Sequence, residues 1–161
     1  MKVDVSFVIL SFNDSDLVVK AVQSIKKLKT KYSYDIFVVD NGSSDNTPEI
    51  IKNKFPNLNL ILLNNNIGTA AYDKAIKFST SKYVYFTGCD IEVRDDMLDF
   101  LVDFLEKYNN VVQVSPKYLN YKNKNKIDLG GTWLSRSFYS GIISSPIQID
   151  MVKEIPYIGT G

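Results

Sequence analysis

Hydrophobic residues in this chain gather into short continuous runs, which are separated by longer segments of mixed polar and apolar character. A short apolar run rich in β-branched and aromatic side chains is typical of a buried strand. Five such runs predict strands at Val3–Phe12, Ile36–Val39, Leu58–Leu63, Tyr83–Phe86 and Val111–Val114.

The segments between these runs show the spacing of amphipathic helices. Residues Asn13 to Asp16 offer N-cap side chains, and after them apolar residues recur every three or four positions from Leu17 to Leu28. Thr47 is predicted to cap a second helix with Pro48 at its first position, where the fixed φ and missing N–H of proline are tolerated.

Two further helices are predicted. One spans Gly68–Ser79, with Ala71, Ala75 and Phe78 on one face. The other has Asp95 and Asp96 in its first turn, where carboxylates interact favourably with the helix dipole. The apolar stripe of this last helix consists of Leu98, Leu101, Phe104 or Leu105, and Tyr108.

Apolar strands that alternate with helices predict an α/β fold of the Rossmann-like kind. Such strands are buried on both sides, so we expect a mostly parallel central sheet with helices on both faces. At 161 residues, the chain fits one domain. The pattern weakens after Pro116, and residues Tyr118–Gly161 are predicted to be irregular with short strands.

The charge balance and cysteine content narrow the class of protein. The formal net charge is +1, from 19 basic and 18 acidic residues, whereas nucleic-acid binders usually carry a basic excess. Cys89 is the one cysteine, so no intrachain disulfide can form, which suits a reducing compartment. We expect a cytoplasmic protein that binds no nucleic acid, and peripheral contact with the cytoplasmic face of the membrane stays open.

The absence of histidine removes several chemistries, among them Ser-His-Asp catalysis and histidine-bound zinc. A metal would have to be held by oxygen atoms, which favours Mg or Mn. The sequence contains no Gly-x-Gly-x-x-Gly element after the first strand and no P-loop. A bound diphosphate would therefore need a divalent cation to offset its charge.

Polar residues follow each of the first four predicted strands. In an open parallel sheet, ligands bind beyond the carboxyl ends of the strands. These ends carry Ser11–Asp14, Asp40–Asp45, Asn64–Gly68 and Thr87–Glu92. Asp90 is the best-placed cation ligand, because it follows a buried strand and stands close to a glycine that lets a phosphate approach the backbone.

Four motifs between residues 5 and 93 resemble, in order and spacing, those of the family-2 glycosyltransferases, whose catalytic domain has the GT-A fold. The run Asp35–Asp45 resembles the VVDNGSTD signature and is the strongest of the four. Val5–Asn13 resembles the first strand of the family, and Asn66–Ala70 resembles its NxGxA element. Gly88–Val93 resembles NPDVEV, the variant of the DxD motif found in rhamnosyltransferase-like members.

The resemblance implies a binding site for a UDP-, GDP- or dTDP-linked sugar at this edge of the sheet. Its residues lie at strand ends or in the following loops: Leu10, Phe12, Asp40, Asn41, Ser43, Asn66, Gly68, Gly88, Cys89 and Asp90. By this resemblance, Leu10 and Phe12 would line the nucleobase pocket. Asp40 and Asn41 would contact base and ribose, and Asn66 and Gly68 would shape the pocket floor.

The implied reaction transfers a hexosyl or deoxyhexosyl group, with inversion, to a glycan or lipid-linked acceptor. Asp90 would bind the Mg or Mn ion that bridges the donor diphosphate, while a carboxylate base deprotonates the acceptor hydroxyl. Ile155–Gly161 resembles the start of an acceptor-side element of the family. In the family the base usually lies beyond this element, so we expect it outside this chain. Asp73, Glu92 and Asp128 are the weaker candidates within it.

By the same resemblance, residues 1–161 would be a single donor domain that ends before the acceptor-side part. The apolar segment Ile142–Ile158 would then lack part of its cover, which leaves a homodimer open. Two other function classes also stay open. One is a sugar-phosphate nucleotidyltransferase, which usually has a glycine-rich basic loop where this chain has Ser11–Asp14. The other is a non-catalytic nucleotide-binding module or an inactive relative of the glycosyltransferases, because a fold alone does not fix a function.

Overall fold

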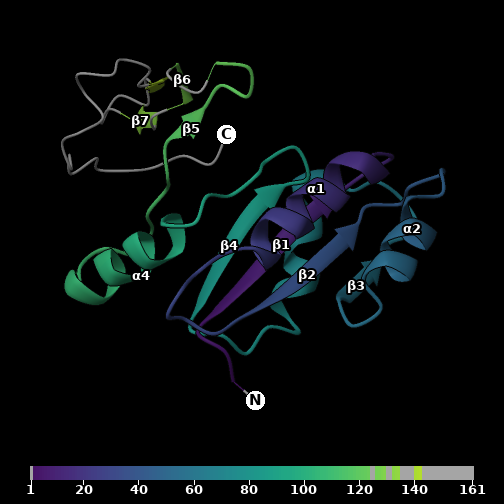
Figure 1. Cartoon of the computed structure of the whole chain (residues 1–161), viewed down its shortest axis with the longest axis horizontal. Coiled ribbons are helices and arrows are strands. Elements are labelled where there is room, and N and C mark those ends of the chain that lie inside the picture. Colours follow the sequence, from purple (N-terminus) through teal and green to yellow (C-terminus); the bar gives the residue numbers. More distant parts are fainter. Residues whose placement is uncertain (1, 124–125, 130–131, 135–139, 143–161) are drawn as a thin grey trace. The chain divides into compact units, whose positions relative to one another are not determined.

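The computed structural model describes residues 2–123, 126–129, 132–134 and 140–142 (Figure 1). The chain divides into two compact units, Met1–Asp99 and Phe100–Gly161. The element predicted at residues 155–161 and most of the apolar segment 142–158 lie outside the described residues. The homodimer and the limits of the donor domain therefore stay predictions.

Four parallel strands form the sheet of the first unit: β1 (Val5–Ser11), β2 (Tyr34–Asp40), β3 (Asn59–Leu62) and β4 (Tyr83–Gly88). Their hydrogen-bonded order is β3-β2-β1-β4. At the carboxyl edge, Ser11 pairs with Asp40 and Leu10 pairs with Gly88. The predicted parallel sheet is confirmed, with β1 between β2 and β4.

Helices cover both faces of this sheet. Figure 1 shows α1 (Ser15–Lys26) crossing in front of the sheet with α2 (Thr47–Lys54) beside it. On the opposite face, η1 (Gly68–Ala71) and α3 (Tyr72–Ile76) bring Ala71 and Ala75 against Val8, Phe37 and Val39.

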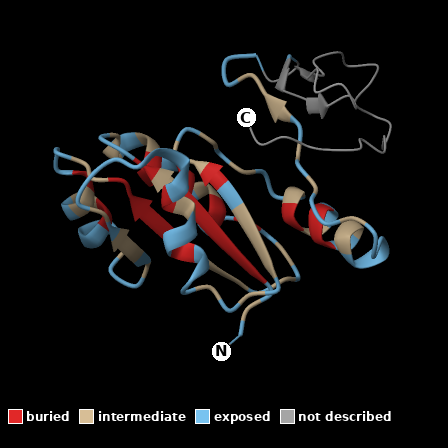
Figure 2. Ribbon diagram, turned by 180° about the vertical axis from the view of Figure 1, so that it is seen from behind, coloured by how far each residue is buried: buried red, intermediate tan, exposed pale blue. Residues whose placement is uncertain are grey.

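Burial of apolar side chains between these layers forms the core of the first unit. The buried side chains are concentrated on β1, β2 and the inner face of α1 (Figure 2). Phe7, Ile9, Val22 and Val38 are all fully buried. Each such side chain contributes roughly 1.5–3 kcal/mol relative to an exposed one.

The second unit contains short strands, as predicted for the region after Pro116. β5 (Tyr118–Leu119) pairs antiparallel with β6 (Ile127–Leu129), and β7 (Thr132–Leu134) pairs antiparallel with β8 (Ser140–Ile142). Helix α4 (Met97–Lys107) begins in the first unit and continues into the second. Within the described residues, no helix is long and apolar enough to cross a bilayer.

Two predictions from apolar runs are wrong. Val111–Val114 forms no strand, and Val112 is 96% exposed. β-branched residues favour a strand only where they can pack against a neighbouring strand and a covering layer.

The predicted helix at Gly68–Ser79 is instead a 3-10 turn followed by a short α-helix, and Phe78 is 67% exposed rather than on the buried face. Gly68 has a φ of +65°, so regular helix cannot begin at this residue.

The predicted helix starts also shift. Asn46 precedes α2, and Thr47 is its first residue, whose N–H donates to the Asp45 carboxylate (3.0 Å). Asp95 and Asp96 lie in the turn before α4 rather than in its first turn. Helix ends differ by one or two residues even between assignments of the same structure, and these shifts are of that size.

Asp4 ties together the amino ends of β1, β2 and β4. Its backbone N–H donates to the Ser33 carbonyl, and its carbonyl accepts from the N–H of Tyr83, both at 3.0 Å. Its carboxylate accepts from the Ser33 hydroxyl (2.7 Å) and the Ser33 N–H (2.9 Å). The side-chain and then the backbone hydrogen bond from Ser33 lower the pKa of Asp4 below its ordinary value of 3.8.

At the opposite edge, the turn after β2 touches the loop after β3. Gly42 has a φ of +81°, and a Cβ built on it would lie 2.7 Å from the Asn65 backbone. Gly68 also has a positive φ, yet a Cβ there would meet nothing within 4 Å. Gly42 is therefore required both for its backbone conformation and for the close approach of the two loops.

We expect the Asp4 carboxylate to make stability depend on pH in the acid range. A folded-state pKa below the unfolded value contributes stability above the unfolded pKa, and this stability is lost as pH falls through the folded pKa. Asp4→Asn should therefore show a smaller loss of urea midpoint than the unsubstituted chain as pH falls from about 5 to about 2. Asp73→Asn, on the exposed side of α3, is the matched control. Identical pH profiles for Asp4→Asn and the unsubstituted chain would contradict this.

Alanine at the two left-handed glycines should separate backbone strain from steric contact. Gly68→Ala meets only the strain and should lower the free energy of unfolding by about 1–2 kcal/mol. Gly42→Ala must also push Asn65 away and should cost about 2–4 kcal/mol. Urea denaturation measures both, and equal losses would show that the contact between the loops is not tight.

Candidate functional site

The carboxyl edge of the sheet contains a topological switch at the end of β1. The chain passes from β1 to β2 on one side, while β4 joins β1 on the other. The N–H of Asn41 donates to the Ser11 carbonyl (2.8 Å), and the N–H of Cys89 donates to the Leu10 carbonyl (3.1 Å). The loops after β2 and β4 thus diverge on either side of β1, which is where open α/β sheets bind ligands.

The carboxylate of Asp40 closes the turn after β2. Asp40 is 2% exposed, and its two oxygens accept from the Ser43 hydroxyl (2.6 Å) and the Ser43 N–H (2.9 Å). An ionised carboxylate offers about four lone-pair sites. The turn therefore uses part of the acceptor capacity of Asp40 and fixes its orientation.

Asn13 joins the loop after β1 to the same turn, a role that the sequence analysis did not assign to it. Its N–H donates to the Ser43 hydroxyl (2.8 Å), and its side-chain oxygen accepts from the N–H of Ser44 (2.8 Å). Its φ is +51°, a conformation that asparagine tolerates better than most residues. An asparagine directly after a buried strand was the available signal.

The side chain of Asn41 connects the loop after β2 to the loop after β3. This residue is 2% exposed. Its amide nitrogen donates to the side-chain oxygen of Asn66 (2.8 Å) and to the Gly68 carbonyl (3.2 Å). Its amide oxygen accepts from the N–H of Ile67 (3.0 Å). Both amide hydrogens are therefore used within the protein.

Asn66 completes this connection. Its side-chain oxygen also accepts from the N–H of Gly68 (2.9 Å), so it receives two hydrogen bonds. The Asn41 amide oxygen faces the N–H of Ile67, and the amide nitrogen faces the carbonyl of Gly68. These two partners fix the orientation of the amide. Asn41, Asn66 and Gly68, all predicted site residues, thus form one hydrogen-bonded group.

Asp90 differs from Asp40 because it is exposed. A Cβ built on Gly88 would lie 2.6 Å from the Asp90 side-chain oxygen, so the carboxylate folds back over the glycine. Gly88 therefore leaves room for this carboxylate beside the backbone at the end of β4.

Cys89 lies between these two residues and is half-buried. Burial, followed by the negative charges of Asp14 and Asp90, raises the pKa of its thiol. The thiol is therefore protonated at neutral pH, which argues against a nucleophilic role.

Within the described residues, no three acidic or cysteine side chains come together as a metal cage. Mg²⁺ and similar hard cations are usually bound by one or two carboxylates together with water and substrate phosphates. The exposed Asp90 fits this second mode, since it supplies one carboxylate and leaves the other positions to a diphosphate.

The remaining predicted residues are more scattered. Leu10 packs against the core cluster on the α3 face, whereas Phe12 is 44% exposed at the end of β1. Asp73 is exposed on α3, and Asp128 lies in β6 of the second unit. Glu92 borders a hollow of about 610 Å³ between α1 and residues 92–96. This hollow is lined by both lysines and carboxylates, and it is separate from the group around Asp40 and Asn41.

Comparison with known proteins gives matches at the family and structural levels. Residues 6–150 match the family Glycosyl transferase family 2. Poly-beta-1,6-N-acetyl-D-glucosamine synthase of Staphylococcus epidermidis is 29% identical over 106 residues, covering 64% of this chain and 26% of that protein. The chain thus spans about a quarter of the length of the curated relatives that it matches.

Solved structures share the fold at low sequence identity. S. aureus TarS 1-349 in complex with UDP-GlcNAc gives a TM-score of 0.56 at 20% identity, over 74% of this chain and 41% of that one. The mannosyltransferase PcManGT from Pyrobaculum calidifontis, in complex with GDP-Man and Mn²⁺, gives 0.55 at 23% identity, over 65% and 33%. Because the family match covers most of the sequence, the chain belongs to glycosyl transferase family 2, and its parallel sheet with flanking helices is that of the GT-A fold.

Proposed function

We propose that this chain is the donor-binding part of a glycosyltransferase that uses a nucleotide-sugar, with UDP as the nucleotide. The observation that carries the proposal is the exposed Asp90 carboxylate beside the switch point of a parallel sheet, opposite a turn organised by Asp40. UDP is the first choice because TarS was crystallised with UDP and with UDP-GlcNAc. A GDP- or dTDP-linked donor is the alternative, and PcManGT was crystallised with GDP-Man.

In this proposal, Asp90 supplies the protein ligand for an Mg or Mn ion. The ion, when bound with the donor, neutralises charge on the diphosphate as it becomes the leaving group. No lysine or arginine occurs in residues 11–16, 40–46, 63–68 or 88–90, so these loops offer no cationic side chain to the phosphates. The complex of PcManGT with Mn²⁺ supports the same choice of cofactor.

The two asparagines act as positioning residues in this proposal. Since the Asn41 amide is fully engaged with residues 66–68, it shapes the pocket rather than reading the base. Phe12 offers an exposed ring at the end of β1, on which a nucleobase can stack. The lone pairs of Asp40 that Ser43 leaves unused can accept from the base or ribose.

The acceptor side is also a proposal. We infer transfer with inversion to a glycan or lipid-linked acceptor, in the cytoplasm, by a protein of which this chain is the donor-binding part. The family match makes a sugar-phosphate nucleotidyltransferase the weaker alternative. A transferase assay on variants of Asp73, Glu92 and Asp128 separates a base within the chain from an inactive relative.

Affinity for UDP should depend on metal through Asp90. We expect calorimetry to show at least about tenfold tighter UDP binding with Mn²⁺ than with a chelator, which corresponds to about 1.4 kcal/mol. Asp90→Asn keeps the shape but loses the charge that holds a hard cation, so it should remove most of this difference. Glu92→Gln, two residues along the same loop, is the control and should retain it. Equal UDP affinity with metal and with chelator would contradict the metal role, and no UDP binding at all would contradict the donor.

A further inference from the structure

Asn41 is followed by Gly42, and this is the one Asn-Gly dipeptide in the sequence. The backbone nitrogen that follows an asparagine can attack the carbon of the side-chain amide. Glycine hinders this attack least, because it has no side chain beside the attacking nitrogen. Asn41 is therefore the asparagine of this chain whose side chain is most easily lost when the chain is unfolded.

The reaction replaces the amide of Asn41 by a carboxylate, and water is its only co-reactant. A bond forms between the Gly42 nitrogen and the Cγ of Asn41. The bond from Cγ to the amide nitrogen breaks, and ammonia leaves with the proton of the Gly42 N–H. Water then opens the five-membered imide at one of its two carbonyls. One opening gives aspartate, and the other gives isoaspartate, whose main chain runs through the side-chain carbon.

The folded structure holds the reacting amide in place. Asn41 is 2% exposed, so little water reaches it. Its amide nitrogen donates to the side-chain oxygen of Asn66 (2.8 Å) and to the Gly68 carbonyl (3.2 Å). Its amide oxygen accepts from the N–H of Ile67 (3.0 Å). Loss of ammonia breaks the first two hydrogen bonds, and attack at Cγ moves the oxygen away from its donor.

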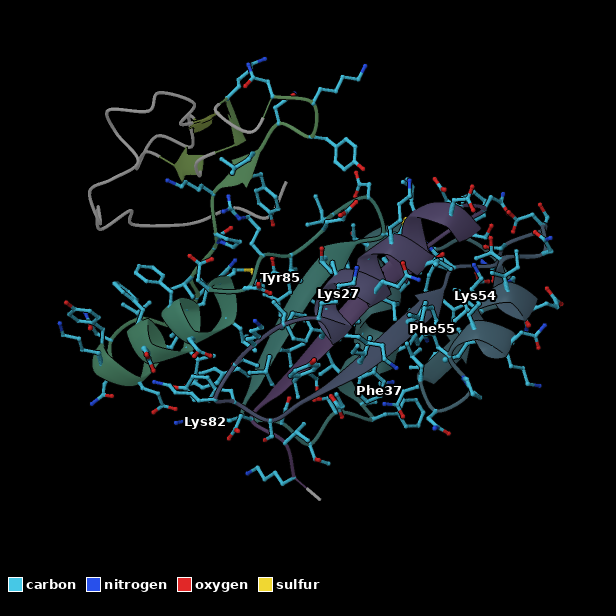
Figure 3. The ribbon with its side chains drawn as sticks, viewed as in Figure 1. Lys27, Phe37, Lys54, Phe55, Lys82 and Tyr85 are labelled. Carbon is cyan, nitrogen blue, oxygen red and sulfur yellow. The ribbon has the colours of Figure 1, made fainter. Side chains whose placement is uncertain are left out.

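The segments on both sides of these hydrogen bonds are anchored in the core. Phe37 (Figure 3) and Val39 lie on β2, the strand that ends one residue before Asn41. Ala71 is the last residue of η1, the 3-10 turn that starts within the partner segment 66–68. All three apolar residues belong to one buried cluster. The Asn41 amide therefore leaves its partners only when this cluster also opens, which requires much of the unit to unfold.

Neither product fits the place that Asn41 occupies. An ionised aspartate has no hydrogen to donate, so its oxygens would face the Gly68 carbonyl and the Asn66 side-chain oxygen, which are both acceptors. Isoaspartate adds a carbon to the main chain directly before Gly42. A Cβ built on Gly42 would already lie 2.7 Å from the Asn65 backbone, so the extra carbon has no room. A chain that has reacted thus loses the connection between the two loops.

We propose that Asn41 is a deamidation site that the fold keeps closed and that reacts when the chain unfolds. The hydrogen bonds that position the loops thereby also set the chemical lifetime of the site. Each unfolding event exposes the dipeptide, and a chain that has reacted refolds without the Asn41 connection. Unfolding consequently becomes irreversible in proportion to the time spent unfolded. The inference depends on neither the donor nor the metal.

Peptide mapping by mass spectrometry tests this proposal. The chain is kept in mildly alkaline buffer, either folded or unfolded in guanidinium chloride, and the mass increase from amide to carboxylate is followed at Asn41. We expect Asn41 to react at least about a hundredfold more slowly in the folded chain, because a stable domain is unfolded in fewer than roughly one molecule in a thousand. At intermediate denaturant, the rate should follow the unfolded fraction measured by circular dichroism.

A matched control places the same dipeptide on the surface. Val111→Gly puts a glycine after Asn110, which is exposed in the turn that follows α4. In this variant, Asn110 should react at rates that agree within about threefold in the folded and the unfolded protein, because the fold does not bury it. Asn41 in the same molecules should keep its protection, so the comparison is independent of buffer and denaturant.

Asn41→Asp tests whether the product is tolerated. This variant carries the amide-to-carboxylate change without the extra main-chain carbon. At a urea concentration near the midpoint of the unsubstituted chain, we expect its ratio of unfolded to folded molecules to rise about tenfold or more, since buried acceptors then face one another. Asn110→Asp makes the same change at an exposed position and should leave the urea midpoint unchanged.

Equal rates of Asn41 loss in the folded and unfolded chains would overturn the proposal, because the fold would then give no protection. In the unfolded chain, a rate at Asn41 no faster than at Asn57, which precedes a leucine, would also overturn it. An unchanged urea midpoint in Asn41→Asp would show that the product is accepted and that deamidation does not make unfolding irreversible. Protection of Asn41 in a chain that binds no UDP would refute the proposed function and leave this inference intact.

Discussion

The arrangement of the candidate site depends on one buried amide, the side chain of Asn41. A buried primary amide that lacked partners would cost roughly 1–3 kcal/mol for each unsatisfied group. Here its partners all come from residues 66–68, so satisfying the amide positions the loop after β3. Gly42 then has to bring its backbone against Asn65, which only a glycine permits. Asn13 adds the loop after β1 to the same turn through Ser43 and Ser44. Hydrogen bonds within the protein thereby hold three strand ends in one arrangement.

Two kinds of acidic residue lie at the carboxyl edge, one held within the hydrogen-bonded turn and one exposed beside it. Asp40 is buried and already accepts hydrogen bonds from Ser43, so its charge is used to shape the turn. Asp90 is exposed, and Gly88 gives its carboxylate room beside the backbone. A divalent cation needs the second kind, since a carboxylate that is occupied by protein donors has fewer lone pairs to offer. One free carboxylate is enough where a diphosphate supplies further oxygen ligands.

The sequence predicted the features that depend on periodicity and on strand ends. Four apolar runs became the four parallel strands, and Asp40 and Asp90 lie at the same edge, because parallel strands bring their carboxyl ends together. The resemblance to family-2 glycosyltransferases is confirmed by the family match. The predicted strand at Val111–Val114 and the predicted burial of Phe78 were wrong for the same reason. An apolar run indicates that its residues can be buried. Whether they are buried depends on a neighbouring strand or helix, and the local sequence pattern does not show which element that is. The engagement of the Asn41 amide was equally inaccessible, since it depends on a loop 25 residues away in sequence.

Counts of charged residues likewise do not show where those residues lie in the structure. The totals of 19 basic and 18 acidic residues describe a nearly neutral chain, and the absence of a nucleic-acid partner that they indicate stays a prediction. Parallel topology sorts those charges, because every strand in the sheet begins at one edge and ends at the other. The loops after β1, β2 and β4 therefore bring Asp14, Asp40 and Asp90 to one edge of the sheet. A nearly neutral chain can thus gather carboxylates where a metal-linked donor is expected, because topology and not the total charge decides where they meet.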